Sequence, residues 1–258
     1  MIANAFRLAL VALLLTPAAA LAQAPQEPPK STEAPKPPVP PLVEPALSDD
    51  AAFARNIAVI RADLSTADAL VKERDWVDAR PHVNFPREEI YGAIRADLKT
   101  YKVPAFDGVL RELAHAVAAR NVKLYERASK KVQTALVAAD FSLQARQKDW
   151  PRFTLQVAAA VLSDAADEYD DAVANGRVVR SVGYQSARGL VFETDRMIDA
   201  VAKDAAARSP DNFKQLRGNL MRLKQTFASA AAPREAPAAV ETLRTLIVQT
   251  AALMRGIP

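Results

Sequence analysis

Residues 48–73 read SDDAAFARNIAVIRADLSTADALVKE, and the spacing of the apolar side chains in this stretch decides the fold class. Ser48 followed by two aspartates is typical of a helix N-cap with an acidic first turn. After this cap, apolar side chains return every three or four residues, at Phe53, Ile57, Ile60, Leu64, Ala67 and Val71. This period matches one face of an α-helix, so the stretch predicts a long amphipathic helix over about residues 50–73.

The same spacing recurs through the rest of the chain. A short helix around Trp76 is expected to end at Pro81, and Pro86 is expected to open the next one. Further helices are predicted at about 106–120, 122–140, 150–175, 178–207, 210–227 and 237–255. The helix at 150–175 is expected to end at Asn175-Gly176, a pair suited to a left-handed cap. With only 7 glycines and few β-branched runs, the composition favours helix over sheet. We therefore predict an all-α fold: an antiparallel bundle of about seven helices, either undivided or split into two subdomains near residues 145–150.

The N-terminus has the form of a secretory signal peptide over residues 1–22. Arg7 supplies a positive charge, Leu8–Leu15 form a short apolar run, and Ala20-Leu21-Ala22 fits the small-residue cleavage pattern. The apolar run is shorter than the roughly 20 residues that a transmembrane helix needs. We expect cleavage before Gln23, export to the periplasm, and no membrane span in the mature chain.

A proline-rich segment follows over residues 23–47. Proline fixes the backbone angle φ and lacks the amide donor, so this segment is predicted to be an extended, disordered linker rather than a helix or strand. It serves either as a docking segment or simply as a leader between the signal peptide and the folded part. Residues 48–258 are then the helical domain.

Composition and motifs exclude several classes of function. The chain has no cysteine, which rules out disulfides, thiolate metal sites and cysteine nucleophiles. Its 34 basic and 30 acidic residues are interspersed, so nucleic acid is not an expected partner. The GxSxG, HExxH, P-loop and GxGxxG signatures are all missing, and we predict that the protein is not an enzyme.

The least generic stretch is residues 75–92, which read DWVDARPHVNFPREEIYG. It brings His82, Glu88 and Glu89 together at a proline-bounded join, with Tyr91 beside them. Imidazole and carboxylate groups are ligands for a divalent metal or iron, so these residues are a candidate metal site. In the alternative, the two glutamates only complement the positive first turn of a helix, and His82 binds a loop carbonyl.

The pattern of Trp76, Pro81, His82, Pro86 and Glu88 in this stretch resembles a helical motif of uncharacterised exported bacterial proteins. More distantly, it is similar to the imelysin and EfeO-type periplasmic helical bundles linked to iron uptake. That resemblance implies a metal motif of the form H-x-x-E. Glu88 occupies the position of the motif's glutamate, and Phe85 stands where the motif has histidine.

Two further polar groups stand out. Asp164, Asp167, Glu168 and Asp171 have the spacing of one helical face and could bind a hard cation, or they form a solvated face paired with basic residues. The second group is a ligand-binding or structural polar cluster on the helix predicted at 178–207. It comprises Tyr184, Gln185 and Arg188, with Glu193 and Arg196 nearby.

From the sequence we therefore predict an exported, periplasmic, all-helical binding or interaction protein. Its expected partner is a periplasmic protein or a small ligand, and no cofactor is expected. The alternative is a metal-handling protein of the iron-uptake kind, in which His82, Glu88 and Glu89 hold a divalent metal or iron. A hydrolase ranks below both.

Overall fold

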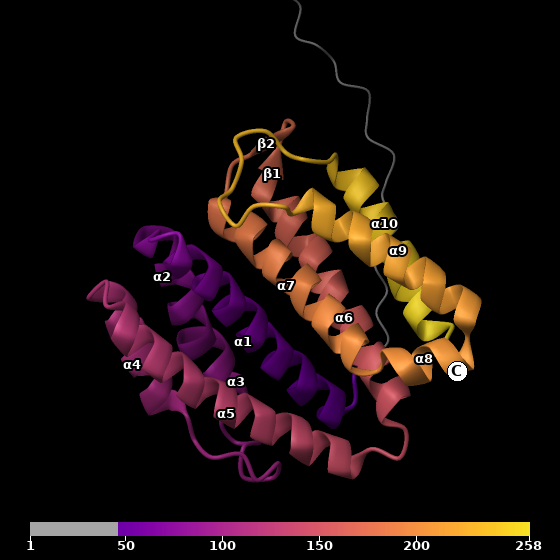
Figure 1. Ribbon diagram of the computed structural model, residues 1–258, viewed down its shortest axis with the longest axis horizontal. Helices are drawn as coiled ribbons and strands as arrows, with labels where there is room; N and C mark the ends of the chain where they lie inside the picture. The colour runs from indigo at the N-terminus through magenta and orange to yellow at the C-terminus, as the bar shows by residue number, and fades with distance from the viewer. Residues whose placement is uncertain (1–45) are drawn as a thin grey trace, which may run out of the picture. The chain divides into compact units, whose positions relative to one another are not determined.

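A computed structural model describes residues 46–258 (Figure 1). The predicted signal peptide lies outside the described residues, and so does nearly all of the predicted linker at 23–47. Within residues 46–258 the structure is almost entirely helical, which confirms the all-α class. The helices are α1 (Asp49–Lys72), α2 (Trp76–Phe85), α3 (Tyr91–Ile94), α4 (Asp107–Ala118), α5 (Val122–Arg146), α6 (Trp150–Ala172), α7 (Ser181–Ala200), α8 (Ala202–Arg208), α9 (Pro210–Thr226) and α10 (Val240–Arg255).

Helix α1 forms as its sequence predicts. The Ser48 side chain accepts a hydrogen bond from the Ala51 amide at 3.3 Å, which satisfies one of the free amides of the first turn. Phe53, Ile57 and Leu64, on the predicted apolar face, are buried. Because α1 buries residues on most of its surface, it lies inside the molecule and has other helices on several sides.

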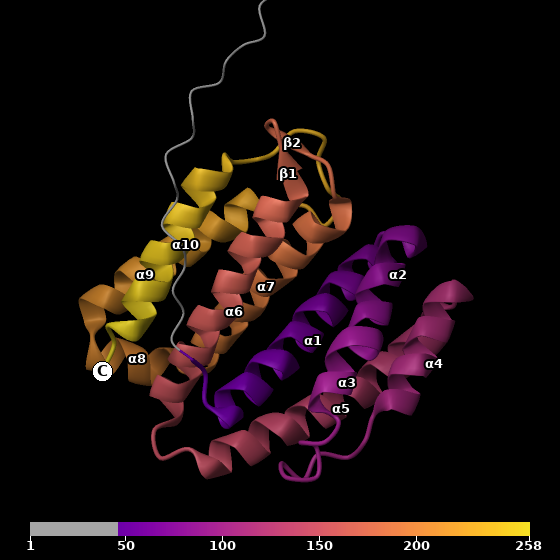
Figure 2. The same ribbon diagram turned by 180° about the vertical axis from the view of Figure 1, so that it is seen from behind.

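Four helices of the C-terminal half form a closed bundle. Helix α6 packs on α7, α7 on α9, α9 on α10, and α10 back on α6 (Figures 1 and 2). The short helix α8 connects α7 to α9 and packs on α9. This arrangement explains why α6 is apolar nearly all round: Leu155 points to one side and Val157 and Val161 to the opposite side, and all three are buried.

The N-terminal half adds a second group of helices to this bundle. Helix α1 lies between α5 on one side and α6 and α7 on the other, and α4 packs on both α2 and α5 (Figure 1). The turn between α5 and α6 falls at residues 147–149, where the alternative subdomain boundary was placed. A division into two subdomains stays a prediction. The packing of α1 against α7 positions the candidate functional site.

The prolines of residues 75–92 act differently from the prediction. Helix α2 continues through Pro81 to Phe85, because the only amide lost would have bonded the carbonyl of Val77, in the exposed first turn. Pro86 then opens a π-helical segment, η1 (Pro86–Ile90), in which the amide of Tyr91 bonds the carbonyl of Pro86. The helix predicted to start at Pro86 is therefore short, since α3 ends at Ile94.

The expected helix end at Asn175-Gly176 is in fact a hairpin turn. Helix α6 stops at Ala172, and the strands β1 (Val173–Ala174) and β2 (Arg177–Val178) pair in antiparallel fashion. Asn175 and Gly176 both have positive φ, of 52° and 70°. That is the requirement of a two-residue type I′ turn, for which Asn-Gly is the preferred sequence. The pair was correctly assigned to the left-handed region but to the wrong kind of turn.

The helix predicted at 178–207 is divided in two. Val201, at φ −119° and ψ 13°, leaves the helical conformation between α7 and α8. Its side chain is buried, and the break allows α8 to turn and pack against α9. Neither proline nor glycine marks this position, so the tertiary packing overrides a sequence that could have continued as one helix.

Helices α1 and α4 are each followed by an arginine in the left-handed conformation. Arg74 and Arg120 have φ of 63° and 51°. After α1, the amide of Asp75 bonds the carbonyl of Leu70 at 2.9 Å, which is the pattern of a Schellman cap. Glycine is the usual residue there, and a side chain in this conformation costs about 1 kcal/mol. A cation at the negative end of the helix offsets part of that cost.

Candidate functional site

Helices α1 and α7 approach each other closely at Gly189. A Cβ atom at this position would lie 2.7 Å from the carbonyl oxygen of Ala62 and 2.5 Å from the hydroxyl of Thr66, both on α1. The Thr66 hydroxyl donates to the backbone carbonyl of Gln185 at 3.4 Å. Because the two backbones lie so close together, polar side chains above and below Gly189 meet across the interface. We call these side chains the polar seam; they form one network around His82 and a second around Arg61.

The His82 network connects three helices. His82 Nδ1 lies 2.9 Å from Asp63 Oδ1 on α1, and its Nε2 lies 3.1 Å from Gln185 Oε1 on α7. The amide nitrogen of Gln185 donates to Asp78 Oδ2 on α2 at 2.8 Å. His82, Asp63 and Gln185 are all buried. Both ring nitrogens of His82 therefore have protein partners.

The hydrogen-bond directions define where the protons lie. Since the nitrogen of Gln185 donates to Asp78, its oxygen faces His82 and accepts the proton of Nε2. A second proton is then held between Nδ1 and Asp63. Burial raises the pKa of Asp63 above its ordinary value, although the hydrogen bond and charge of His82 act in the opposite direction. The folded state thus holds a proton that an unfolded aspartate would release.

Replacing Asp63 by asparagine is expected to remove a pH-dependent loss of stability. A raised carboxyl pKa contributes stability below about pH 4, where the unfolded aspartate is also protonated, and this contribution is lost as pH rises through the folded-state pKa. The free energy of unfolding of the wild type should therefore fall relative to that of Asp63→Asn as pH rises from about 4, by at most about 1.4 kcal/mol per pH unit.

Urea denaturation of both proteins between pH 4 and 8 measures this difference. Burial also raises the pKa of Asp68, but this effect is the same in the two proteins and cancels. The charge of Asp63 raises the pKa of Glu168 in the wild type alone, which adds to the expected difference with the same sign. If the free energy of unfolding of the wild type instead rose relative to that of Asp63→Asn as pH rises, the raised pKa of Asp63 would be contradicted.

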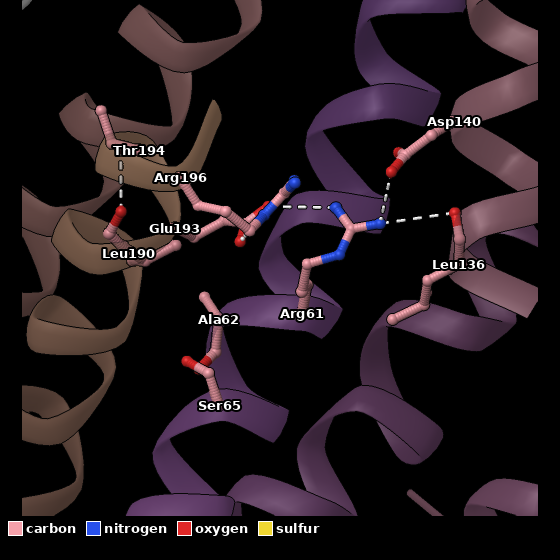
Figure 3. Close-up of polar contacts among 9 residues, drawn as sticks. All are labelled: Arg61, Ala62, Ser65, Leu136, Asp140, Leu190, Glu193, Thr194 and Arg196. Atoms are coloured by element: carbon pink, nitrogen blue, oxygen red, sulfur yellow. Dashed lines mark hydrogen bonds and ion pairs between the residues drawn. The ribbon is translucent and has the colours of Figure 1, made fainter. Parts of the chain in front are cut away.

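The second network surrounds Arg61, which projects from α1 between α5 and α7 (Figure 3). Its guanidinium donates to Glu193 at 3.0 Å, to Asp140 at 2.9 Å and to the carbonyl of Leu136 at 3.3 Å. Arg196 donates two further hydrogen bonds to Glu193, at 2.8 and 2.7 Å. Glu193 is only 3% exposed, so these partners replace its hydration.

Charge is balanced within this second network. Two guanidinium groups, of Arg61 and Arg196, face two carboxylates, of Glu193 and Asp140. Burial by itself lowers the pKa of Arg196, but the hydrogen bonds and charge of Glu193 outweigh it, so the pKa lies above its ordinary value. The network binds α1, α5 and α7 to one another and leaves Glu193 engaged with two cations.

The structure does not bring His82, Glu88 and Glu89 together. His82 is buried in the polar seam, whereas Glu88 and Glu89 are exposed on η1, and Glu88 pairs with its neighbour Arg87 at 2.5 Å. Tyr91 is buried and packs edge-on against Phe106 with ring centroids 4.9 Å apart. Across residues 46–258, no group of three or more His, Asp or Glu side chains is arranged to hold a metal ion. The described donors therefore do not fit a metal centre.

The predicted cluster of Tyr184, Gln185 and Arg188 divides between two faces of α7. Gln185 belongs to the polar seam. Tyr184 donates to the carbonyl of Ser229 at 3.4 Å, and Arg188 donates to the carbonyl of Phe227 at 3.1 Å. Both of these contacts anchor the segment between α9 and α10.

The acidic row on α6 is mostly neutralised by arginines from elsewhere in the chain. Arg55 of α1 binds Asp164 with hydrogen bonds of 2.8 and 2.5 Å, and Arg244 of α10 lies 3.3 Å from Asp167. Arg180 pairs with Asp171 at 3.4 Å. Burial and the nearby charge of Asp63 raise the pKa of the half-buried Glu168.

Sequence analysis missed Arg61, Asp63 and Asp78. One signal was available for Arg61, which follows Ile57 by four residues and therefore lies on the apolar face of α1. A charged residue on a buried face needs a partner.

The C-terminal half of the chain matches a known domain. Residues 144–257 match the family model of the iron permease-associated 4-helix bundle domain. The match begins at the end of α5 and covers α6 to α10, so it includes all four helices of the closed bundle. It spans less than half of the 258 residues and leaves α1 to α4 outside. No curated protein and no solved structure matches the chain.

The match supports the iron-uptake alternative in a general way, at a coarser level than the sequence motif implied. The iron permease-associated 4-helix bundle domain is an iron-uptake-related helical bundle, but the match is not to the imelysin or EfeO-type proteins. It also lies outside residues 75–92, which carried the resemblance. No helix within residues 46–258 is long and apolar enough to cross a membrane.

Proposed function

We propose that this protein is an exported, periplasmic accessory of an iron permease and that it acts by binding a partner protein rather than by catalysis. One observation carries the proposal: the match of residues 144–257 to the iron permease-associated 4-helix bundle domain, which coincides with the closed bundle of α6, α7, α9 and α10. Export is supported by the signal-peptide pattern of residues 1–22. The bundle is then the part that contacts the permease.

Contact with a protein partner accounts for the site better than metal binding by the chain itself. His82 has both ring nitrogens occupied, and Glu88 and Glu89 lie apart from it in the solvent. Iron is therefore the permease's cargo in this proposal. The polar seam has a structural task, which is to hold the N-terminal helices against the bundle that meets the permease.

The exposed face of α9 and α10 is the contact surface that the bundle offers. A groove of about 720 Å³ runs between these helices, and its lining includes Gly218, Met221 and Leu253. Met221 is 59% exposed, although it is a large apolar side chain. Phe141 on α5 is similarly apolar and 68% exposed, but it lies outside the matched domain and serves as a matched control.

Deletion of the gene is expected to lower the uptake of radioactive iron by cells under iron limitation, and the full-length gene is expected to restore it. Met221→Glu should restore uptake poorly and should reduce chemical cross-linking to the permease, because a buried charge opposes docking. Phe141→Glu should restore iron uptake and should cross-link to the permease as the wild type does. Fractionation of the same cells should find the protein in the periplasm. Unchanged iron uptake in the deletion strain would refute the proposal.

A further inference from the structure

A separate cavity of about 400 Å³ lies between the C-terminal end of α1 and the N-terminal part of α5. This volume falls within the range of roughly 300–1,000 Å³ that is usual for small-molecule sites. The cavity is distinct from the polar seam and lies outside the matched domain.

The floor of this cavity is a hydrogen-bonded pair, a buried tyrosine and a half-buried aspartate. The Tyr125 hydroxyl donates to Asp68 Oδ1 at 2.6 Å, and Tyr125 is 3% exposed. Burial raises the pKa of Asp68, while the hydrogen bond from Tyr125 and the charge of Lys72 act in the opposite direction. Burial and the adjacent carboxylate also raise the pKa of Tyr125, so the phenol keeps its proton. The Tyr125 phenol therefore adds no negative charge to the floor, and Asp68 is its one ionisable carboxyl group.

The rim of the cavity is cationic. Lys72, Arg74 and Lys130 line it, and Glu126 is the one carboxylate among its exposed lining residues. The side chains of Arg74 and Lys130 form no ion pair or hydrogen bond with any other part of residues 46–258. Arg74 also adopts the left-handed conformation at the end of α1, which fixes the direction in which its side chain leaves the backbone. Two uncompensated cations thus flank a cavity of ligand size.

We propose that this cavity binds a small oligocarboxylate anion. Several carboxylates on one small molecule can reach Arg74 and Lys130 at once, and the phenol ring of Tyr125 with the nearby valines accepts the carbon skeleton. The anion can arrive free or as its ferric complex. The proposal does not depend on the permease association, so each can fail without the other.

Calorimetric titration of the full-length mature protein with citrate, at low ionic strength, tests the proposal. Citrate is expected to bind saturably, and the affinity should fall as salt is added. Arg74→Ala combined with Lys130→Ala should weaken binding about tenfold, while Asp68→Asn should strengthen it about fivefold by removing a negative charge from the floor. Asparagine still offers an oxygen to the Tyr125 hydroxyl, so the floor is kept.

Lys203→Ala combined with Lys214→Ala is the matched control, because it also removes two exposed cations, but far from the cavity. Binding to this control should equal that of the wild type. Parallel titrations with ferric citrate show whether the protein prefers the free anion or its ferric complex. Binding of either form supports the proposal if the binding depends on Arg74 and Lys130. Three results would overturn it: no saturable binding of either form, equal binding by the Arg74 and Lys130 double variant, or inorganic phosphate binding as tightly as citrate.

Discussion

Replacing Arg61 by methionine is expected to lower the free energy of unfolding by about 3 kcal/mol, because it removes one partner of a buried charge network. Glu193, which is almost wholly buried, would lose its bond from α1, and the carbonyl of Leu136 would lose a donor. The loss stays moderate because Arg196 keeps its two bonds to Glu193, and Asp140 is exposed enough to be hydrated. Urea denaturation followed by circular dichroism measures the change.

Two companion variants separate the network from a general effect of losing an arginine. Arg111 is 64% exposed and pairs with Asp107 one helical turn away, so Arg111→Met should lose less than about 1 kcal/mol. Adding Glu193→Met to Arg61→Met should recover much of the lost stability, since no buried carboxylate then remains with only one of its two cations, and Arg196 is 45% exposed and can be hydrated. If Arg61→Met were as mild as Arg111→Met, the network would not hold α1 against the bundle.

The sequence predicts most of the helices because the helical period is a local property. The apolar stripe of α1 and the Ser48 cap needed no knowledge of distant residues, and both are present. The errors have two causes. Pro81 is accommodated inside α2 because the backbone hydrogen bond that it removes lies in the exposed first turn. Val201 interrupts a helix without any proline or glycine, because packing between α8 and α9 outweighs the local signal to continue.

The polar seam could not be predicted in the same way, because its partners are far apart in sequence. Arg61 and Glu193 are 132 residues apart, and His82 and Gln185 are 103 apart. Proximity in sequence instead suggested joining His82 to Glu88, although His82 bonds Asp63 and Gln185 inside the seam and Glu88 pairs with Arg87 at the surface. Spacing along one helix identifies a face, but not what lies opposite that face.

Replacing Gly189 by alanine is expected to destabilise the protein by about 3 kcal/mol and to lower its melting temperature by about 6–12 °C. The added Cβ would lie 2.5 Å from the Thr66 hydroxyl and 2.7 Å from the Ala62 carbonyl. A backbone carbonyl inside a helix cannot move aside alone, so α1 as a whole must shift away from α7. That shift would lengthen the hydrogen bonds of both networks in the polar seam.

Gly218 provides a matched comparison, because it also lies inside a helix but has open space around the position of a Cβ atom. Gly218→Ala should therefore stabilise the protein by about 0.5–1 kcal/mol, through helix propensity alone. Adding Thr66→Ala to Gly189→Ala should recover only part of the loss, since the Ala62 carbonyl remains in place. If Gly189→Ala raised the melting temperature as Gly218→Ala does, α1 and α7 could not be in the close contact that brings the seam residues within hydrogen-bonding distance.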